Sequence, residues 1–575
     1  MRWLYCLLLI GSPLAPHAQD ILDRVVSLEL RHRPLAQVLD SIGGRAHFDL
    51  SYNSTILRGD SVVSVSFRQI TVRQALDRLL GKNYTYTERG NYLILLPAQP
   101  PEVTYVLTGY VIDRNTGQKL VQASVYEKEQ LQSTLTDDQG FFRLRLKGRY
   151  QNPVLTVSKE WYADTAIVLR PGYDQALSVG LEPARVKELS PVLISYTRVE
   201  RTRWGRFFLS SRERIQSMNI GSFFTNKPYQ LSLTPGLGTH GKLSGQVTNR
   251  VSINMIGGYS AGTTGGEAGG VFNIDKKSMS GLQAAGVFNM AGGKVSGLQV
   301  AGAFNEGLDS IGGVQAAGAV NVAAGRFAGL QVAGAVNEAG LGFVGVQIAG
   351  AVNRGAQRFD GVQIAGAVNA AAGRFAGLQV AGAVNNCADT LRGVQVSGFL
   401  NRASVLKGVQ IGILNMADTS EGYSIALLDL VKRGGIHRLS LSGAPVTGFT
   451  LAYKSGNQKL YDILLLGYNP SSLYSMGYGL GKEYSFRGGW GLSGELTARQ
   501  LYNRHWDNLG TIYEFQPALT YRVDKRLRIF AGPSFCLHVY PADLPTDAER
   551  PTLPGLAWGS RTNAWIGFSA GIDFF

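Results

Sequence analysis

The side chains of this 575-residue sequence that could bind a metal or act in catalysis are few and scattered. The six histidines beyond residue 18 show neither metal-ligand spacing nor a nucleophile motif; they are His32, His47, His240, His437, His505 and His538. Cys536 and His538 share one side of an expected strand, but two ligands are too few for a zinc site. The sequence predicts no catalytic residue, no metal site and no cofactor, and therefore no enzyme.

Two other motifs resemble ligand sites but are better explained as turns. The run from Gly236 to Gly241 fits G-x-G-x-x-G, yet residues 246–255 after it are typical of a strand, so no helix N-terminus is available to hold a pyrophosphate. Asp137 and Asp138 could contribute to a calcium site, but the six or more oxygen ligands that calcium requires are not visible nearby. We expect these aspartates to bond turn amides instead.

The strongest pattern is a 16-residue repeat with glutamine and asparagine at fixed positions. Each full unit reads close to G-L-Q-V-A-G-A-V-N, as in residues 297–305. The repeat positions singled out are Gln283, Asn289, Gln299, Asn305, Gln315, Asn321, Gln331, Asn337, Gln347, Asn353, Gln363, Asn369, Gln379, Asn385, Gln395 and Asn401. Glu267 takes the glutamine place in the first unit and Gln410 lies one residue early in the last, as expected for terminal copies of an array.

The repeat predicts one strand per unit, with Leu298 and Val300 on one face and Gln299 and Asn305 on the other. Val295 lies an odd number of residues before Leu298, which indicates a corner at the small residue and glycine between them, and a second corner is expected after the asparagine. Two corners in a short unit favour a β-solenoid. Nine coils at ~4.8 Å would form a rod of roughly 43 Å, with stacked amide ladders and a surface of Gln, Ala and Asn.

A competing interpretation makes each unit one transmembrane strand plus a turn, so that residues 228–575 close as a single large barrel. The solenoid is preferred.

From residue 436 onward about eight strands are expected, and their alternation predicts an outer-membrane-type antiparallel barrel. The expected strand ends are Gly443, Ser455, Gly467, Tyr484, Tyr502, Val523, Tyr540 and Phe575. Tyr513, Phe515 and Leu519 alternate with Glu514 and Thr520, so that one face suits lipid and the other a polar interior. The chain ends in an aromatic strand, although its apolar alternation runs through Phe574 rather than Phe575. The alternative is a soluble antiparallel sandwich.

Residues 1–18 read as a secretory signal, with Arg2, an apolar stretch at residues 4–10 and a small residue, Ala18, at the cleavage point. Only Cys387 and Cys536 lie beyond it, and two buried thiols are expected rather than a pair. No later window holds roughly 18 uninterrupted apolar residues, so membrane residence would require a closed barrel.

Two N-terminal segments carry family patterns. L-x-x-V-L-D-x-I at residues 35–42 and T-V-R-Q-A-L-D-R-L-L at residues 71–80, within an α+β module over residues 19–100, resemble the secretin and TonB short N-terminal domain. That resemblance implies a periplasmic module that contacts a regulator or another envelope protein. The alternative is a small module without a partner.

Residues 103–184 are expected to form a β-sandwich. The motifs at residues 107–117 and 136–144 are similar to those of the carboxypeptidase regulatory-like domain. A basic linker at 185–227, a β-hairpin or cap at 228–264, the repeats at 265–418 and the barrel at 419–575 complete the expected order. The repeats resemble a bacterial surface-repeat family with the pattern G-[LV]-Q-[IV]-x-G-x-x-N.

These expectations describe a mainly β, exported envelope protein. The net charge of +15 suits an acidic lipid or polysaccharide surface, and nucleic acid is not an expected partner of an exported chain. We expect a non-catalytic outer-membrane surface or scaffold protein with its N-terminal domains in the periplasm, outer-membrane lipid around the barrel, and a glycan or other surface ligand on the repeats. The alternative is a signalling or transport component whose N-terminal module contacts a periplasmic regulator or TonB-type machinery. No plug-like stretch is found, which argues against a TonB-dependent importer.

Overall fold

The computed structural model describes residues 20–53, 57, 59–97, 103–184, 198–355, 357–444, 446–542, 555–558 and 561–575. The expected signal segment lies outside these residues. The chain divides into two compact units, the first of which holds the N-terminal α+β module and the second the repeats and the C-terminal strands. Within the described residues, no helix has the length and apolar character needed to cross a membrane.

Residues 20–97 fold as the small α+β module that the sequence predicts, with a two-stranded sheet β1-β3 and a three-stranded sheet β2-β5-β4. Its elements are η1 (Ile21–Asp23), β1 (Val25–Pro34), α1 (Leu35–Ala46), β2 (Asp49–Ser51), β3 (Val62–Thr71), α2 (Val72–Leu80), η2 (Gly81–Asn83), β4 (Tyr84–Arg89) and β5 (Tyr92–Pro97). The apolar face of α1, which includes Val38 and Ile42, is buried in the core. Thr71 and Gln74 form the expected capping box at the start of α2.

The next strands form two sheets, ordered β11-β10-β7-β8 and β12-β6-β9. They are β6 (Thr104–Asp113), β7 (Ser124–Glu127), β8 (Gln132–Leu135), β9 (Phe141–Lys147), β10 (Val154–Ser158), β11 (Thr165–Val168) and β12 (Gln175–Leu181). The Asp137 carboxylate accepts the amides of Gln139 and Phe141, both at 2.9 Å. This confirms the turn interpretation of that aspartate.

The segment expected as a basic linker is partly folded. Residues 185–197 lie outside the described residues, but η3 (Val199–Arg201), α3 (Arg203–Phe208) and α4 (Ser211–Asn219) follow. Val199 and Leu209 share a core with Tyr259 and Phe288 of the first coils, and the Trp204 ring lies 4.7 Å from that of Phe304. The apolar residues of this segment are separated by arginines, so its sequence gives little sign of this packing.

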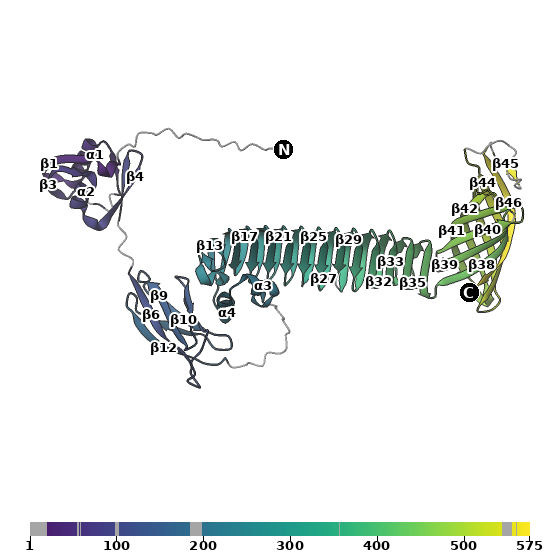
Figure 1. The fold of residues 1–575 in the computed structure, drawn as a ribbon, viewed down its shortest axis with the longest axis horizontal. Helices are drawn as coiled ribbons and strands as arrows, with labels where there is room; N and C mark the ends of the chain where they lie inside the picture. The colour runs from purple at the N-terminus through teal and green to yellow at the C-terminus, as the bar shows by residue number, and fades with distance from the viewer. Residues whose placement is uncertain are drawn as a thin grey trace, which may run out of the picture. The chain divides into compact units, whose positions relative to one another are not determined.

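Residues 225–433 form a parallel β-solenoid, drawn as the long stack of strands in Figure 1, whose 25 described strands follow one another in sequence order. The longer side contains β13 (Thr225–Thr234), β15 (Val247–Asn254), β17 (Gly262–Gly269), β19 (Met279–Ala285), β21 (Val295–Ala301), β23 (Ile311–Ala317), β25 (Arg326–Ala333), β27 (Gly342–Ala349), β29 (Arg358–Ala365), β31 (Arg374–Ala381), β32 (Val384–Ser397), β34 (Val409–Ile411) and β36 (Tyr423–Ile425). The shorter side contains β16 (Gly257–Ser260), β18 (Phe272–Asp275), β20 (Phe288–Ala291), β22 (Phe304–Gly307), β24 (Val320–Ala323), β26 (Val336–Ala339), β28 (Val352–Gly355), β30 (Val368–Ala371), β33 (Leu400–Leu406), β35 (Leu414–Ser420) and β37 (Leu428–Arg433). β32 runs through both sides, and its residues 384–387 pair with β30 on the shorter side.

The solenoid prediction is confirmed, and the array extends beyond the 265–418 expected for it. Each coil pairs with the next in parallel, so that Gln299 lies beside Gln315 and Asn305 beside Asn321. The expected hairpin is present, because β13 pairs antiparallel with β14 (Leu237–Gly238) at the glycine-rich turn. However, β13 also pairs in parallel with β15. Residues 228–264 therefore belong to the solenoid itself.

At the corner expected between Val295 and Leu298, Gly297 has a positive φ of +135°, but the strand continues through it. β21 runs unbroken through this position, and Val295 and Gln299 are both buried while Leu298 faces outward. Val295 and Gln299, which are four residues apart, share the inward side, so the odd spacing from Val295 to Leu298 does not break the alternation. The coil also turns between β21 and β22, and again after Gly307, as expected for the second corner.

Two glycine positions in each coil have no room for a side chain. At Gly345 the backbone has a φ of +134°, and an added Cβ would overlap the carbonyl oxygen of Gly329 in the preceding coil. At Gly350 an added Cβ would overlap the carbonyl oxygen of Gly334 in the same way. The coil-to-coil backbone spacing thus requires glycine at both positions.

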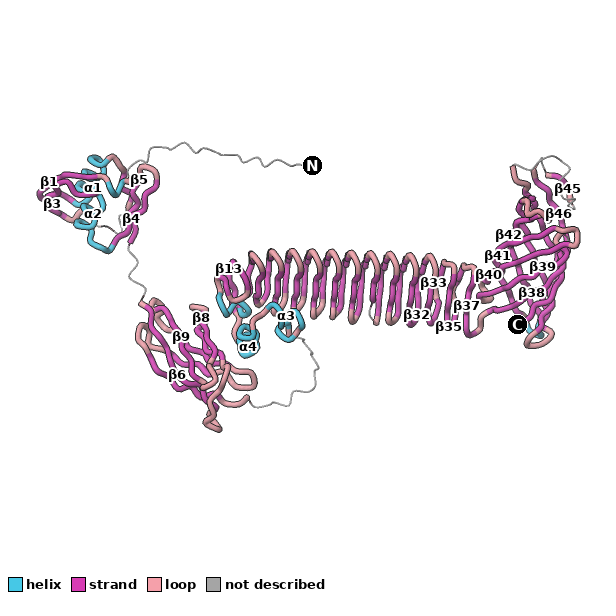
Figure 2. The backbone as a smooth tube through the Cα atoms, in the orientation of Figure 1, coloured by secondary structure: helices cyan, strands magenta, loops and turns pink. Residues whose placement is uncertain are grey.

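The C-terminal strands close into an antiparallel barrel of eight strands, with first and last strands paired. Figure 2 shows them as the separate group of strands at the C-terminal end. The strands are β38 (Ile436–Ala444), β39 (Gly448–Gly456), β40 (Tyr461–Asn469), β41 (Leu473–Ser485), β42 (Trp490–Tyr502), β43 (Asn508–Arg522), β44 (Leu527–Val539) and β46 (Thr562–Phe574), with short β45 (Leu556–Ala557) beside β46 and η5 (Arg487–Gly489) before β42. The predicted strand ends agree with these to within two residues.

The glycine column gives a test of the solenoid geometry. Replacing Gly345 with alanine should lower the free energy of unfolding by about 2–4 kcal/mol, because the positive φ is strained and the Cβ overlaps the neighbouring coil. Gly312→Ala is the matched control, since nothing lies within 4 Å of its added Cβ. Thermal unfolding followed by circular dichroism should separate the two, and equal midpoints would contradict the assigned backbone.

Candidate functional site

The glutamines of the repeat form one continuous ladder of side-chain amides inside the solenoid. Gln299 Nε2 donates to Gln283 Oε1 at 2.8 Å, and the same bond recurs coil by coil up to Gln410, whose Nε2 donates to Gln395 at 2.7 Å. The glutamines of this ladder are fully buried. Because a buried amide is costly when unpaired, each coil depends on its neighbours for hydrogen bonds as well as for packing.

The asparagines form a second ladder that runs in the opposite direction. Asn305 Nδ2 donates forward to Asn321 Oδ1 at 2.9 Å and also to the Ala316 carbonyl at 2.9 Å. In the glutamine ladder each amide donates to the preceding coil, whereas here it donates to the following one. The amide dipoles of the two ladders therefore oppose each other.

The expected surface of Gln, Ala and Asn is wrong. All sixteen predicted repeat positions are brought together, but inside the solenoid, where each is 0% exposed. Leu298 and Val300, on the other side of the strand, are exposed to 37% and 39%. The alternation itself was predicted correctly. Its assignment to inside and outside was reversed, because the ladders satisfy the amides without water and the interior is therefore able to be polar.

A carboxylate accepts the last bond of the glutamine ladder, and another occupies the asparagine position after the end of the asparagine ladder. Glu267 accepts from Gln283 Nε2 at 2.8 Å and from Asn254 Nδ2 at 3.0 Å. Asp429 occupies the asparagine position in the last coil, in register with Asn415, whose Nδ2 donates to Ser424 at 2.8 Å. A carboxylate only accepts hydrogen bonds. It is therefore suited to the end where no further amide has to be supplied.

The last coil is hydrogen-bonded to the barrel strands. The backbone amide of Asp429 donates to Ser455 Oγ at 3.1 Å, and that of Ala426 donates to Asp462 at 3.2 Å. Asn457 Nδ2 donates to the Gly422 carbonyl at 3.0 Å. Burial, together with the nearby Asp462 carboxylate, raises the pKa of Asp429 to about 7. The carboxyl group at this junction therefore carries a proton in mildly acidic solution.

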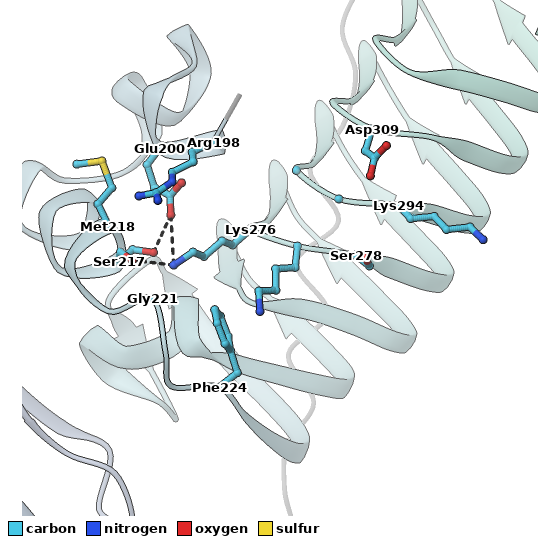
Figure 3. Close-up of a pocket in the computed structure, with 13 residues that line it drawn as sticks. Arg198, Glu200, Ser217, Met218, Gly221, Phe224, Lys276, Ser278, Lys294 and Asp309 are labelled. Atoms are coloured by element: carbon cyan, nitrogen blue, oxygen red, sulfur yellow. Dashed lines mark hydrogen bonds and ion pairs between the residues drawn. The ribbon is translucent and has the colours of Figure 1, made fainter. Parts of the chain in front are cut away.

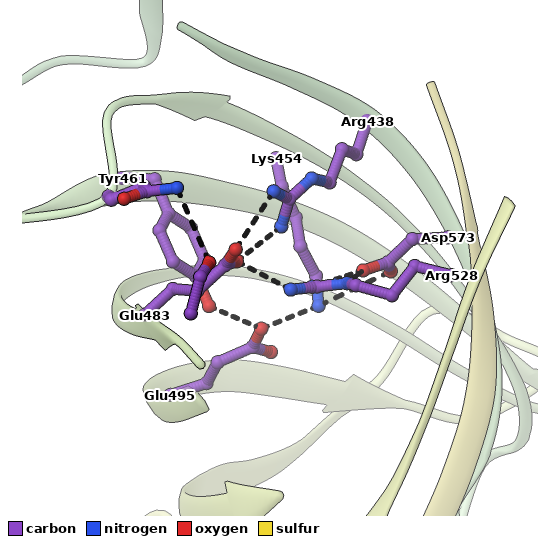
Figure 4. Close-up of polar contacts among 9 residues, drawn as sticks. Arg438, Lys454, Tyr461, Glu483, Glu495, Arg528 and Asp573 are labelled. Carbon is purple, nitrogen blue, oxygen red and sulfur yellow. Dashed lines mark hydrogen bonds and ion pairs between the residues drawn. The ribbon is translucent and has the colours of Figure 1, made fainter. Parts of the chain in front are cut away.

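The barrel has a charged interior and an apolar exterior. Inside, as Figure 4 shows, Glu483 bonds both Arg438 and Arg528, the Arg438 Nη1 contact being 2.5 Å. Lys454 pairs with Glu495 at 2.5 Å. Arg528 also donates to Asp573 through Nε at 2.8 Å. Three cations and three anions thus balance in a fully buried network, and each has a partner.

The outward residues of the barrel strands are large and apolar. Phe515 and Leu519 on β43 are half exposed, whereas Glu514 and Thr520 between them are buried. This confirms the predicted two-sided alternation. Its repetition on neighbouring strands gives the apolar outer belt and polar interior typical of a transmembrane barrel.

A pocket of about 420 Å³ lies where the segment before α3 meets the first coils, and Figure 3 shows its lining. The buried Glu200 carboxylate accepts from Ser217 Oγ at 2.7 Å and Tyr259 at 2.8 Å. Burial lowers the pKa of Lys276 to about 8, although Glu200 at 3.8 Å opposes that shift. No sequence pattern points to this cluster, because its members are far apart in the chain. Glu200 and Lys276 pair with each other, and we assign the pocket no ligand.

The other residues considered for chemistry stay apart. Cys387 lies buried in the solenoid and Cys536 buried in the barrel, both as free thiols, as predicted. His538 is buried two residues from Cys536. Within the described ranges, no three histidine, cysteine or acidic side chains gather in a way that could hold a metal ion. No protein-family model matches the sequence, and no curated protein matches it.

The glutamine ladder predicts a specific cost of removing one amide. Gln331→Leu leaves the Gln347 donor and the Gln315 acceptor unpaired in the interior, and should reduce the free energy of unfolding by about 2–4 kcal/mol. The same substitution at Gln357, which is exposed, should change it by less than about 0.5 kcal/mol. Chemical denaturation of the two variants gives the comparison. A Gln331 variant as stable as the control would show that the ladder does not contribute.

The junction carboxyl predicts a pH dependence with a defined sign. Because the pKa of Asp429 is raised on folding, its protonated form stabilises the folded state at low pH, and this contribution is lost as the pH rises through 7. Asp429→Asn, which supplies the amide of the preceding coils, should raise the melting midpoint at pH 8 and change it little at pH 5. Asp389→Asn, at an exposed position of β32, is the control. An unchanged pH dependence in the Asp429 variant would contradict this role.

Proposed function

We propose that this chain is a non-catalytic outer-membrane surface or scaffold protein. In this proposal the eight-stranded barrel anchors the chain in lipid, the N-terminal modules lie in the periplasm, and the solenoid is an interaction surface. The observation that supports it best is the closed barrel, whose exposed strand positions are mainly large and apolar and whose interior holds the buried ion-pair network. Closure satisfies the backbone polar groups, which is the requirement for crossing a bilayer with strands.

The barrel interior favours an anchor over a channel. The ion-pair network of Arg438, Lys454, Glu483, Arg528 and Asp573 fills the middle of the barrel. Beside it, the cavity next to Arg499 has a volume of only about 10 Å³, which is room for one water molecule at most. A solute would have to break buried salt bridges to pass, which costs several kcal/mol for each pair.

A second role, as a signalling or transport component, rests on the two sequence patterns of the N-terminal module alone. The module would contact a periplasmic regulator or TonB-type machinery. The contacts of its described residues neither add to nor detract from that role. The anchor and scaffold function is therefore the one we put forward.

Membrane residence is tested with the full chain expressed in a Gram-negative host. The protein should stay in the membrane pellet after carbonate extraction and should migrate differently on gels before and after boiling. Leu451→Arg, on the apolar outside of β39, should reduce the heat-modifiable fraction, because arginine within the hydrocarbon costs about 2–4 kcal/mol. Val523→Arg, at the turn after β43, is the matched control. Release of the intact chain by carbonate would refute the proposal.

A further inference from the structure

The outside of the solenoid carries a long face without a single charged residue. Five successive outward columns, at the positions of Leu298, Val300, Gly302, Ala303 and Phe304, contain only apolar residues and glycine except for one tyrosine, from residue 282 to residue 428. Its most exposed members are Leu282, Val287, Leu298, Val300, Val332, Ile348, Ile364, Phe399, Ile411, Ile413, Tyr423, Ile425 and Leu427. We call these five columns the apolar face.

The charges of the coils lie at the border of this face and on the remaining sides. Glu338, Arg354 and Arg402 lie two residues beyond its edge on the shorter strands. Arg326, Arg358 and Arg374 follow the second corner. Asp360 and Arg392 each lie directly before the first glycine of their repeat unit. The solenoid is therefore polar inside, charged along its turns and apolar on one outer face. A soluble monomer seldom exposes an apolar patch of more than a few hundred Å², which indicates that this face is covered in the working protein.

The chain itself covers only the beginning of the apolar face. Trp204 of α3 lies 4.7 Å from the Phe304 ring and 5.8 Å from the Phe288 ring. Phe208 lies 4.8 Å from Phe288. In the described part of the chain no element plays this part for the later coils, where Ile348 and Ile364 stay exposed to 38% and 41%.

We propose that the uncovered part of the apolar face is covered by the same face of a second copy of this chain, as a sheet-on-sheet dimer. Eight coils at ~4.8 Å make the uncovered part roughly 38 Å long, and the two strands and their corner make it about 15–20 Å wide. That is on the order of 600–750 Å² for each copy, close to the ~800 Å² per partner of a stable interface. Two copies share the same coil spacing, so their side-chain rows match in period.

The composition of the face favours a second copy over lipid. The lipid-facing side of the barrel is rich in large rings, among them Tyr484, Trp490 and Phe568. The central coils of the apolar face carry Ala, Val, Ile and Gly instead, and lack the aromatic and basic residues that position a protein at a bilayer surface. Small side chains allow two sheets to approach to ~10 Å and interdigitate. This inference does not depend on where the barrel resides.

The test introduces charge at the centre of the apolar face of the full chain. Ile348 and Ile364 are neighbours in adjacent coils, and replacing both with arginine would place like charges within a dry interface. The unaltered protein in mild detergent should have twice the mass of one chain by light scattering after subtraction of the detergent, and the double variant the mass of one chain. Val344→Arg is the matched control, because Val344 is 57% exposed in the same strand but lies outside the apolar face. It should remain a dimer with an unchanged melting midpoint.

A second measurement excludes masking of the face by detergent. Copies labelled at Gln357→Cys with a donor or an acceptor fluorophore are mixed in lipid vesicles, where energy transfer should occur and should be lost in the Ile348/Ile364 double variant. An absence of transfer between unaltered copies, with single-chain mass in detergent, would overturn the proposal. If brominated lipids then quench a fluorophore at Ile364→Cys, the face is a lipid-contacting surface instead. Neither result decides the carbonate and gel-shift test, which examines membrane residence of the barrel separately.

Discussion

The hydrogen bond between identical side-chain amides in successive coils is the interaction on which the solenoid depends. Sixteen residues bring the chain back to the same place, so each Gln and each Asn meets its own counterpart in the next coil. A side chain that both donates and accepts can repeat without limit, which neither a carboxylate nor an ammonium group can do. The polar interior, the parallel strand pairing and the glycine columns all follow from this exact repetition of one coil.

An interior that is filled by amides changes what the outside can be. In most small β-proteins, apolar residues are needed for the core, whereas here aromatic and aliphatic residues such as Phe343 and Phe359 fill only one side of it. The remaining apolar residues are left on the outer face. The barrel has the same arrangement, with charges inside and apolar rings outside. Both parts therefore need surroundings that cover apolar surface, which we propose are a second copy for one and lipid for the other.

Much of this architecture could be predicted from the sequence, because the coils and the barrel strands both follow regular sequence periods. The 16-residue spacing predicted the coils, and the two-residue alternation around Glu514 and Thr520 predicted the barrel strands. What sequence could not decide was the direction of alternation in the coils. A Gln facing water and a Gln in a ladder look alike until the neighbouring coil is in place. The packing of residues 198–219 and the cluster around Glu200 also required tertiary contacts that no local pattern records.

The two amide ladders allow such a rod to vary in length. Every interior coil offers the same bonds above and below, so one coil could be duplicated or deleted in the gene without leaving an unmatched amide. The ends cannot be exchanged in this way, since Glu267 accepts the last bond of the glutamine ladder and Ser424 accepts that of the asparagine ladder. The length of the solenoid can therefore change in whole steps of 16 residues, while the coils at its two ends stay the same.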